Sequence, residues 1–379
     1  MEKELFALLR LGVGNSTIEE EILSDFIVMP AKQWVRIGEL AQKQGVLGVF
    51  LDGVEKLSAS GYGATRELPV ELKLEWIGEV LQIEQSNQQQ KTVMNALAEK
   101  WSKEGCRTMV FKGQANGTFY PKPEHRSPGD IDCYLINDNE NDNENSPRTQ
   151  VEAYKRGNEI AREAGADVDE GWYKHSQIHY KGEMFENHQY FVHTRDGKRG
   201  KRLNRELVEQ LRVDSLEFRE LPAAPAVVMP PVQWNAMFLT YHACAHFVSE
   251  GLRLKQILDW AMFLKAHQSD VDWGSFYGFC ERNHLTRFAD AMNHIAANYI
   301  GVQIANPVIV KDSPYAERIL ENALYEEDYV FGSGDGSWHN RWHLVRNLFH
   351  YRWKYEEIYE TSPWKQLWWY ATGFLFKTE

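Results

Sequence analysis

Two carboxylates separated by one residue are the clearest candidates for chemistry in this chain. Asp130 and Asp132 flank Ile131 and lead into the apolar run Cys133–Ile136, which predicts a β-strand. Because strand side chains alternate between faces, both carboxylates are expected to project to the same side. Two negative charges on one face repel each other unless a cation lies between them. The pair therefore predicts a site for Mg²⁺ or Mn²⁺, ions that bind one or two carboxylates together with substrate phosphates.

A cation and a glycine precede this pair. The strand-like run Met109–Phe111 ends at Lys112-Gly113, and small residues follow as far as Thr118. A strand-to-helix turn there would offer phosphates the Lys112 ammonium and a close approach to the Gly113 backbone. The start of the next helix would add its dipole. Arg126 is placed to meet either the phosphates or the carboxylates.

These residues, in this order, resemble the uncharacterised nucleotidyltransferase family of the DNA polymerase β-like superfamily. The family pattern is a strand with Lys-Gly, then Tyr-Pro, an Arg, and Asp-Ile-Asp on a second strand. The chain supplies Lys112-Gly113, Phe119-Tyr120-Pro121, Arg126 and Asp130–Leu135. The resemblance implies that an acceptor oxygen attacks the α-phosphate of a nucleoside triphosphate and that pyrophosphate leaves. Asp130 and Asp132 would hold one or two metal ions that bridge the phosphates.

The resemblance also implies an α+β fold. A polymerase β-like nucleotidyltransferase core, a mixed β-sheet with flanking helices, is expected over residues 105–220. Periodic apolar positions predict an N-terminal helical segment over residues 1–104 and a C-terminal all-helical domain over 232–379. The proline-rich stretch 222–231 predicts the linker before that domain. Within the core, a helix is expected over residues 148–164.

A third carboxylate is expected from the family, on a strand that ends in an acidic residue, an apolar residue and His. The runs Trp172–Tyr180 and Glu186–His193 predict paired strands. The sequence Phe191-Val192-His193 keeps the His but has Phe where the carboxylate belongs. The groups that could take over its role as the general base are Glu183, Glu186, Asp196 and His193.

Two histidines lie four residues apart in the C-terminal half. His242 and His246 share one face of a predicted helix, and a turn at Gly251 leads into the segment that contains Asp259. The family shows the same order of His, turn, Leu-Arg and Leu-Asp. We expect a hydrogen bond between His246 and Asp259 and a contact of His242 at the active-site cleft. The alternative is an independent metal centre, but a zinc peptidase would have Glu where Ala243 stands.

Composition narrows the class of protein. A length of 379 residues allows two or three domains, or one domain with helical additions. The hydrophobic content of 43% supports a well-buried core. The net charge of −12 argues against extended nucleic-acid binding but not against a nucleotide, whose phosphates a metal can neutralise. No signal peptide is apparent, and no stretch approaches the about 18 apolar residues of a membrane span. Four cysteines without metal-type spacing predict free thiols in a soluble, cytoplasmic protein.

Other classes of function stay open. Phe191 is compatible with a protein that keeps the fold and senses nucleotide without turnover. A toxin- or antitoxin-like interaction module is a further alternative, because relatives of this fold often act in that way. The nucleotide base, the acceptor (a sugar or other small molecule, a protein hydroxyl or an RNA end) and the oligomeric state are not specified by the sequence.

Overall fold

The computed structural model describes most of the chain. The described residues are 2–15, 18–137, 147–193, 197–214, 217–249, 251–325, 345–346, 348–365 and 367–368. Asp196, one of the candidates for the third carboxylate, lies outside them.

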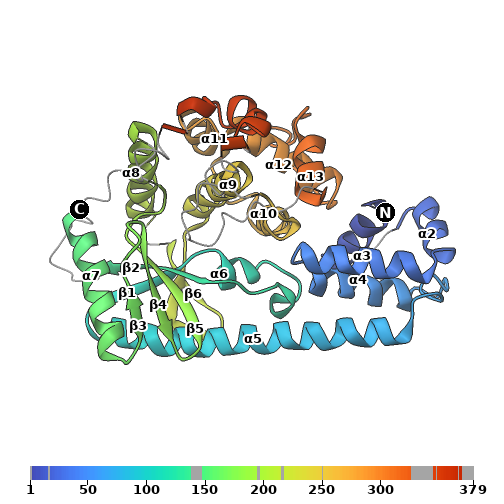
Figure 1. Cartoon of the computed structure of the whole chain (residues 1–379), viewed down its shortest axis with the longest axis horizontal. Helices are drawn as coiled ribbons and strands as arrows, with labels where there is room; N and C mark the ends of the chain where they lie inside the picture. Colours follow the sequence, from blue (N-terminus) through green and yellow to red (C-terminus); the bar gives the residue numbers. More distant parts are fainter. Residues whose placement is uncertain are drawn as a thin grey trace.

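A mixed sheet lies at the centre of the protein (Figure 1). The described residues form seven strands in the order β3-β4-β5-β2-β1-β7-β6. The strands are β1 (Cys106–Val110), β2 (Ile131–Asn137), β3 (Asp167–Asp169), β4 (His175–Tyr180), β5 (Glu183–His188), β6 (Arg219–Leu221) and β7 (Ala224–Met229). β2 is antiparallel to β1 and parallel to β5, and β7 is parallel to β1. A mixed sheet with flanking helices confirms the predicted α+β class.

Helices precede the sheet, as the sequence predicts. They are α1 (Glu2–Gly12), α2 (Glu20–Ile27), α3 (Ala31–Lys43), α4 (Leu47–Ala59) and α5 (Val70–Lys103). α1 and α4 pack so closely that a Cβ at Gly53 of α4 would lie 2.0 Å from the carbonyl oxygen of Leu8 on α1. The long helix α5 runs from these helices to the sheet and passes beneath it (Figure 1). One helix therefore connects the N-terminal helices to the core.

The two faces of the sheet are covered by different helices. α5 and α7 (Pro147–Glu163) cover one face, where Trp101 packs in one apolar cluster with Cys133 and Leu135. On the other face, Tyr134 belongs to a cluster that includes α8 (Gly197–Val213) and α9 (Val232–Ser249). Since the side chains of β2 alternate, Asp132 lies on the same face as Tyr134. That face is the one toward the C-terminal helices.

The C-terminal helices lie above the sheet in Figure 1. They continue with α10 (Leu254–His267), α11 (Trp273–Arg282), α12 (Thr286–Asn298) and α13 (Ala316–Tyr325), and a π-helical turn follows at Lys354–Ile358. Their apolar side chains share one continuous core with those of α1–α4. The N-terminal and C-terminal helices therefore pack against one another around a shared hydrophobic core.

The segment predicted to be a linker is part of the sheet. β7 pairs with β1 through Thr108 opposite Val227 and Met109 opposite Val228. The run Ala224–Met229 is apolar and buries Ala224, Val227 and Met229. Pro225 is exposed near the start of the strand, a position where proline is tolerated. The sheet therefore extends to Met229, beyond the predicted end of the core at residue 220.

Two expectations from composition can be compared with the structure. All four cysteines are buried free thiols, as predicted. Within the described residues, every helix is too short or too polar to cross a membrane.

Candidate active site

The two predicted carboxylates lie where β2 begins. Asp132 is on the strand and is 5% exposed, whereas Asp130 precedes the strand and is exposed. Glu186 on β5 is the register partner of Asp132, so the two side chains share one face of the sheet. Nε2 of His188 joins them, at 3.0 Å from Asp132 Oδ1 and 3.3 Å from Glu186 Oε2. Three carboxylates and a histidine are therefore gathered at this end of the sheet.

The electrostatics of this group fit a cation. Although Asp130 is exposed, its carboxylate is partly desolvated by its surroundings, and this desolvation together with the charges of Glu186 and Asp132 raises its pKa. Burial alone would also raise the pKa of Asp132, but the Lys112 charge and the hydrogen bond to His188 hold it far below its ordinary value. Asp132 is therefore ionised, and Lys112 balances its negative charge. The negative charge of Asp130 is not fully balanced by nearby positive groups. A divalent ion would supply the missing positive charge.

Lys112 reaches into the site from the turn after β1. Its Nζ lies 2.6 Å from Asp132 Oδ1, and its backbone has φ 64°, a conformation that is uncommon for residues other than glycine. Gly113 follows with φ 37° and opens α6 (Gly113–Gly117). This helix has five residues, so the helix dipole expected at the turn is only that of a single turn. In the structure Lys112 is the counter-ion of Asp132.

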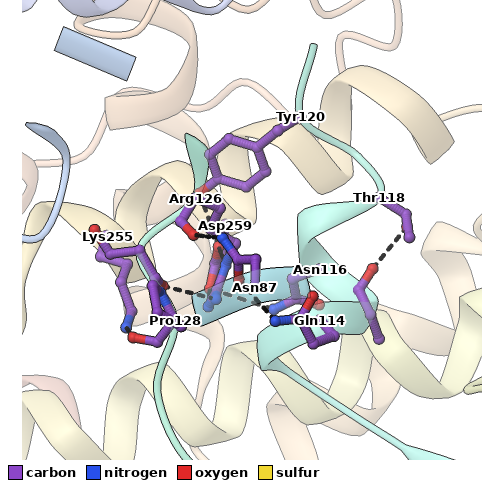
Figure 2. A network of polar contacts seen from close by, with 11 residues as sticks. Asn87, Gln114, Asn116, Thr118, Tyr120, Arg126, Pro128, Lys255 and Asp259 are labelled. Carbon is purple, nitrogen blue, oxygen red and sulfur yellow. Dashed lines mark hydrogen bonds and ion pairs between the residues drawn. The ribbon is translucent and has the colours of Figure 1, made fainter. Parts of the chain in front are cut away.

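Polar side chains of α5 hold the loop that carries Asp130 (Figure 2). Nδ2 of Asn87 donates to the carbonyl oxygens of Glu124 and Arg126, at 2.7 and 3.0 Å. Gln90 donates to the carbonyl of Gly129 at 2.7 Å. Gln90 belongs to the polar run Gln88–Gln90, yet its side chain is buried. A polar run inside an otherwise amphipathic helix was the signal for this contact.

Gln114 of α6 completes this part of the network. Its Nε2 donates to Asn87 Oδ1 at 2.7 Å (Figure 2). The same nitrogen donates to Gln90 Oε1 at 2.9 Å. The amides of α5 can therefore direct their own N–H groups toward the loop carbonyls. The turn after β1 and the loop before β2 are fixed to the same helix.

Arg126 belongs to the scaffold of the site. Its guanidinium forms a bidentate ion pair with Asp259 of α10, at 2.7 and 2.8 Å, and Tyr120 donates to the same carboxylate at 2.8 Å (Figure 2). All three side chains are buried. From the sequence we expected Arg126 to contact the phosphates or the catalytic carboxylates, and His246 to contact Asp259. The structure instead joins Arg126 to Asp259.

Lys255 is a second cation that the sequence interpretation missed. It lies one helical turn before Asp259 on α10, and its Nζ donates to the carbonyl of Pro128 at 3.2 Å (Figure 2). Burial and the charge of Arg126 lower the pKa of Lys255 to about 8. The ammonium is close enough to Asp130 to affect that carboxylate.

The predicted site histidines His242 and His193 have different neighbours, as does His246 beside His242. The His242 ring stacks on Phe238 with centroids 5.5 Å apart and meets the His246 ring at 4.4 Å. Burial and the nearby Lys112 charge hold the pKa of His242 well below its ordinary value, so His242 is a neutral group on the Lys112 side of the site. Nδ1 of His193 lies 2.9 Å from the hydroxyl of Tyr173.

The strand β5 carries two of the candidates for the third carboxylate, Glu183 and Glu186. It ends at His188, so the acidic residue and histidine that end this strand are Glu186 and His188, with Asn187 between them. Phe191 lies beyond the strand in an aromatic cluster with Tyr134 and Trp234, at 4.3 and 4.9 Å between ring centroids. Phe191 therefore lies outside the strand that pairs with β2, and Glu186 is the carboxylate opposite Asp132.

Glu183 and His175 lie on opposite faces of the sheet, and only His175 is on the face of Glu186. Glu183 is three residues from Glu186 and accepts a hydrogen bond from Gln89 of α5, on the opposite face of the sheet. His175 of β4, by contrast, lies beside Glu186 and His188, and the three residues offer ligand atoms within 4.8 Å of one another. Burial and nearby His188 lower the pKa of His175 to about 4.

Comparison with known proteins identifies the family. A family model described as uncharacterised nucleotidyltransferase matches residues 30–301, which include all the site residues above. Searches of curated proteins and of solved structures found no match. The matched segment covers more than half of the 379 residues. The chain therefore belongs to the uncharacterised nucleotidyltransferase family.

Proposed function

We propose that the protein is a metal-dependent nucleotidyltransferase that transfers a nucleoside monophosphate from a nucleoside triphosphate to an acceptor. Membership of the family supports nucleotidyl transfer in general. The observation that carries the specific proposal is that Asp132 and Glu186 share one face of a mixed sheet and that Asp130, just before β2, lies close enough for their charges to act on it. This arrangement, on adjacent parallel strands, is compatible with a polymerase β-like core.

Asp130 and Asp132 are the proposed ligands of Mg²⁺ or Mn²⁺. The raised pKa of Asp130 supports the assignment, since that carboxylate is stabilised by an added positive charge. When bound, the ion neutralises charge on the phosphates and lowers the pKa of the attacking hydroxyl. Glu186, opposite Asp132, is the proposed general base that accepts the proton of this hydroxyl. The acceptor oxygen then bonds to the α-phosphorus, and the bond to the β-phosphate oxygen breaks to release pyrophosphate.

Lys112 is the proposed phosphate contact. Its ammonium is held at the site by Asp132 and can exchange that carboxylate for a β- or γ-phosphate oxygen once the metal compensates Asp132. Gly113 lets the backbone approach the phosphates closely. His242 and Lys255 line the same region, the first as a neutral donor and the second as a cation near Asp130.

The case for a nucleotide sensor without turnover is weakened by Glu186. That alternative was motivated by Phe191 in the position of the third carboxylate, whereas a glutamate is the register partner of Asp132. The substrate base and the acceptor are left to experiment.

The test is transfer of label. The purified chain is incubated with each α-³²P-labelled nucleoside triphosphate, Mg²⁺ or Mn²⁺, and fractions of a cell extract as the source of acceptors. We expect metal-dependent transfer of label and release of pyrophosphate. Asp130→Asn and Glu186→Gln should abolish transfer, and Glu183→Gln, on the opposite face of the same strand, should retain it. Nucleotide binding without transfer would favour the sensor, and equal transfer by all variants would contradict the assigned residues.

A further inference from the structure

We propose that His175, Glu186 and His188 form a binding site for one divalent transition-metal ion, of the Zn²⁺ or Mn²⁺ class, next to Asp132. The site would give the protein a metal ion held by nitrogen ligands in addition to the carboxylate-bound ion of the proposed function. Its existence does not depend on nucleotidyl transfer, because metal binding can be measured without nucleotide. Only its consequence for the reaction rests on the proposed function: an ion bound to one carboxylate oxygen of Glu186 would compete with the role of Glu186 as general base.

Strand register brings the three side chains together. Glu186 and His188 are two residues apart on β5, so they share one face of the sheet. His175 on β4 is the register partner of His188, and their ring centroids are 5.0 Å apart. Asp132 stands opposite Glu186 on the other side of β5. Three neighbouring strands therefore direct two imidazoles and two carboxylates to one point.

The hydrogen bonds of His188 fix the role of each ring nitrogen. Its Nδ1 lies 3.1 Å from the carbonyl oxygen of Tyr190, which can only accept, so Nδ1 carries a hydrogen. Its Nε2 faces Asp132 Oδ1 at 3.0 Å and Glu186 Oε2 at 3.3 Å. A neutral ring would direct a lone pair at two negative oxygens. Either a proton on Nε2 or a metal ion between these atoms removes the conflict.

His175 distinguishes the two solutions. Its side chain is 10% exposed, and its buried Nδ1 makes no hydrogen bond to any residue that the structure describes. That nitrogen lies 3.4 Å from Glu186 Oε2. A proton on His188 would satisfy His188 and leave the His175 nitrogen without a partner. One metal ion would bind both nitrogens and the Glu186 oxygen together.

The donor set indicates the class of ion. Mg²⁺ and Ca²⁺ prefer oxygen ligands, whereas imidazole nitrogen suits zinc and other first-row transition metals. Histidines that bind metal commonly donate their second N–H to a carbonyl or carboxylate, as His188 does to Tyr190. Asp132 Oδ1, beside His188, already forms an ion pair with Lys112. This oxygen would therefore either stay paired with Lys112 next to the ion or bind the ion as a fourth ligand.

Metal titration of the full chain tests the proposal. The protein, freed of metal by a chelator and carrying no histidine tag, is titrated with Zn²⁺ in a calorimeter. Mn²⁺ is added in parallel for pulsed EPR. We expect one Zn²⁺ per chain and a ¹⁴N coupling from imidazole in the Mn²⁺ spectrum. His175→Ala should raise the Zn²⁺ Kd at least about 10-fold and reduce the ¹⁴N coupling.

His179→Ala is the matched control. His179 lies on the same strand as His175 but is exposed, so its loss should change neither measurement. Thermal unfolding verifies that each variant is folded, and His175→Asn replaces the alanine variant if that one is not. Absence of Zn²⁺ binding or an unchanged Zn²⁺ Kd in the His175 variant would overturn the proposal. Transfer with Mg²⁺ alone would still support the proposed function in that event, so the two claims fail separately.

Discussion

Arg126 and Asp259 form a buried bidentate ion pair between the loop that leads to Asp130 and helix α10. Nε lies 2.7 Å from Oδ1 and Nη2 lies 2.8 Å from Oδ2. The Tyr120 hydroxyl donates to Oδ1 at 2.8 Å, which stabilises the carboxylate further. The position of the proposed metal ligand Asp130 thus depends on a C-terminal helix that is far away in the sequence.

Removing Arg126 alone should be strongly destabilising. Arg126→Ala leaves Asp259 buried without its counter-ion, so we expect the free energy of unfolding to fall by about 3–5 kcal/mol. The double variant Arg126→Met with Asp259→Leu removes both charges and should lose much less. Urea denaturation of the two proteins measures the difference. Nucleotide affinity should survive in the double variant, and its loss would return Arg126 to the phosphate-binding role that the sequence predicted.

The two carboxylates of the Asp-x-Asp pair should differ in their effect on stability. Asp130→Asn removes a charge that its neighbours disfavour, so the free energy of unfolding should stay unchanged or rise. Asp132→Asn removes the counter-ion of Lys112 and should lower it by about 1.5–3 kcal/mol. Denaturation without metal measures both effects, and label transfer should be lost in both. Equal destabilisation by the two variants would contradict this account of the charges.

Local patterns in the sequence predicted the elements with strong periodicity. The helix expected over residues 148–164 is α7, Pro147–Glu163, and the strand after Asp130 is β2. The turn of the β4–β5 hairpin was also predictable, because Lys181-Gly182 adopts the positive φ that such turns favour. These features depend on neighbouring residues in the chain.

Features that depend on distant pairing were not predictable. The end of β5 is set by its parallel pairing with β2, so the sequence could not decide between Glu186 and Phe191 as the register partner of Asp132. The prolines near β7 indicated a linker, because the pairing with β1 that makes this segment a strand is remote. The burial of Gln90 was also not predictable, because its partner, the Gly129 carbonyl, belongs to a loop that is distant in the sequence.

Lys112→Met should affect nucleotide and metal in opposite directions. Loss of a charge-assisted hydrogen bond worth about 1.5–3 kcal/mol should raise the nucleotide Kd about 10-fold or more. Divalent-ion binding without nucleotide should tighten, because the ammonium that pairs with Asp132 is gone. Calorimetry measures both constants. Lys181→Met is the matched control, since Lys181 also has positive φ and precedes a glycine but lies at an exposed turn. An unchanged nucleotide Kd would exclude the phosphate contact.

His125 should make stability depend on pH. His125 follows the Tyr120-Pro121 motif in the sequence. Both of its ring nitrogens face carboxylates: Nδ1 lies 2.9 Å from Asp52 Oδ2, and Nε2 lies 2.9 Å from Glu84 Oε1. Only an imidazolium can donate to both. Burial alone would lower the pKa of His125, but the hydrogen bond and charge of Asp52 raise it above its ordinary value of 6.5.

The direction of the effect follows from this shift. A histidine whose folded-state pKa is raised contributes its full stabilisation below about pH 6.5 and loses it as the pH rises through the folded-state value. We therefore expect the free energy of unfolding to decrease above about pH 6.5, as measured by urea denaturation across a pH series. His125→Gln should flatten that dependence, while His179→Gln, at an exposed position, should preserve it. The same slope in the His125 variant as in the unchanged chain would show that other groups cause it.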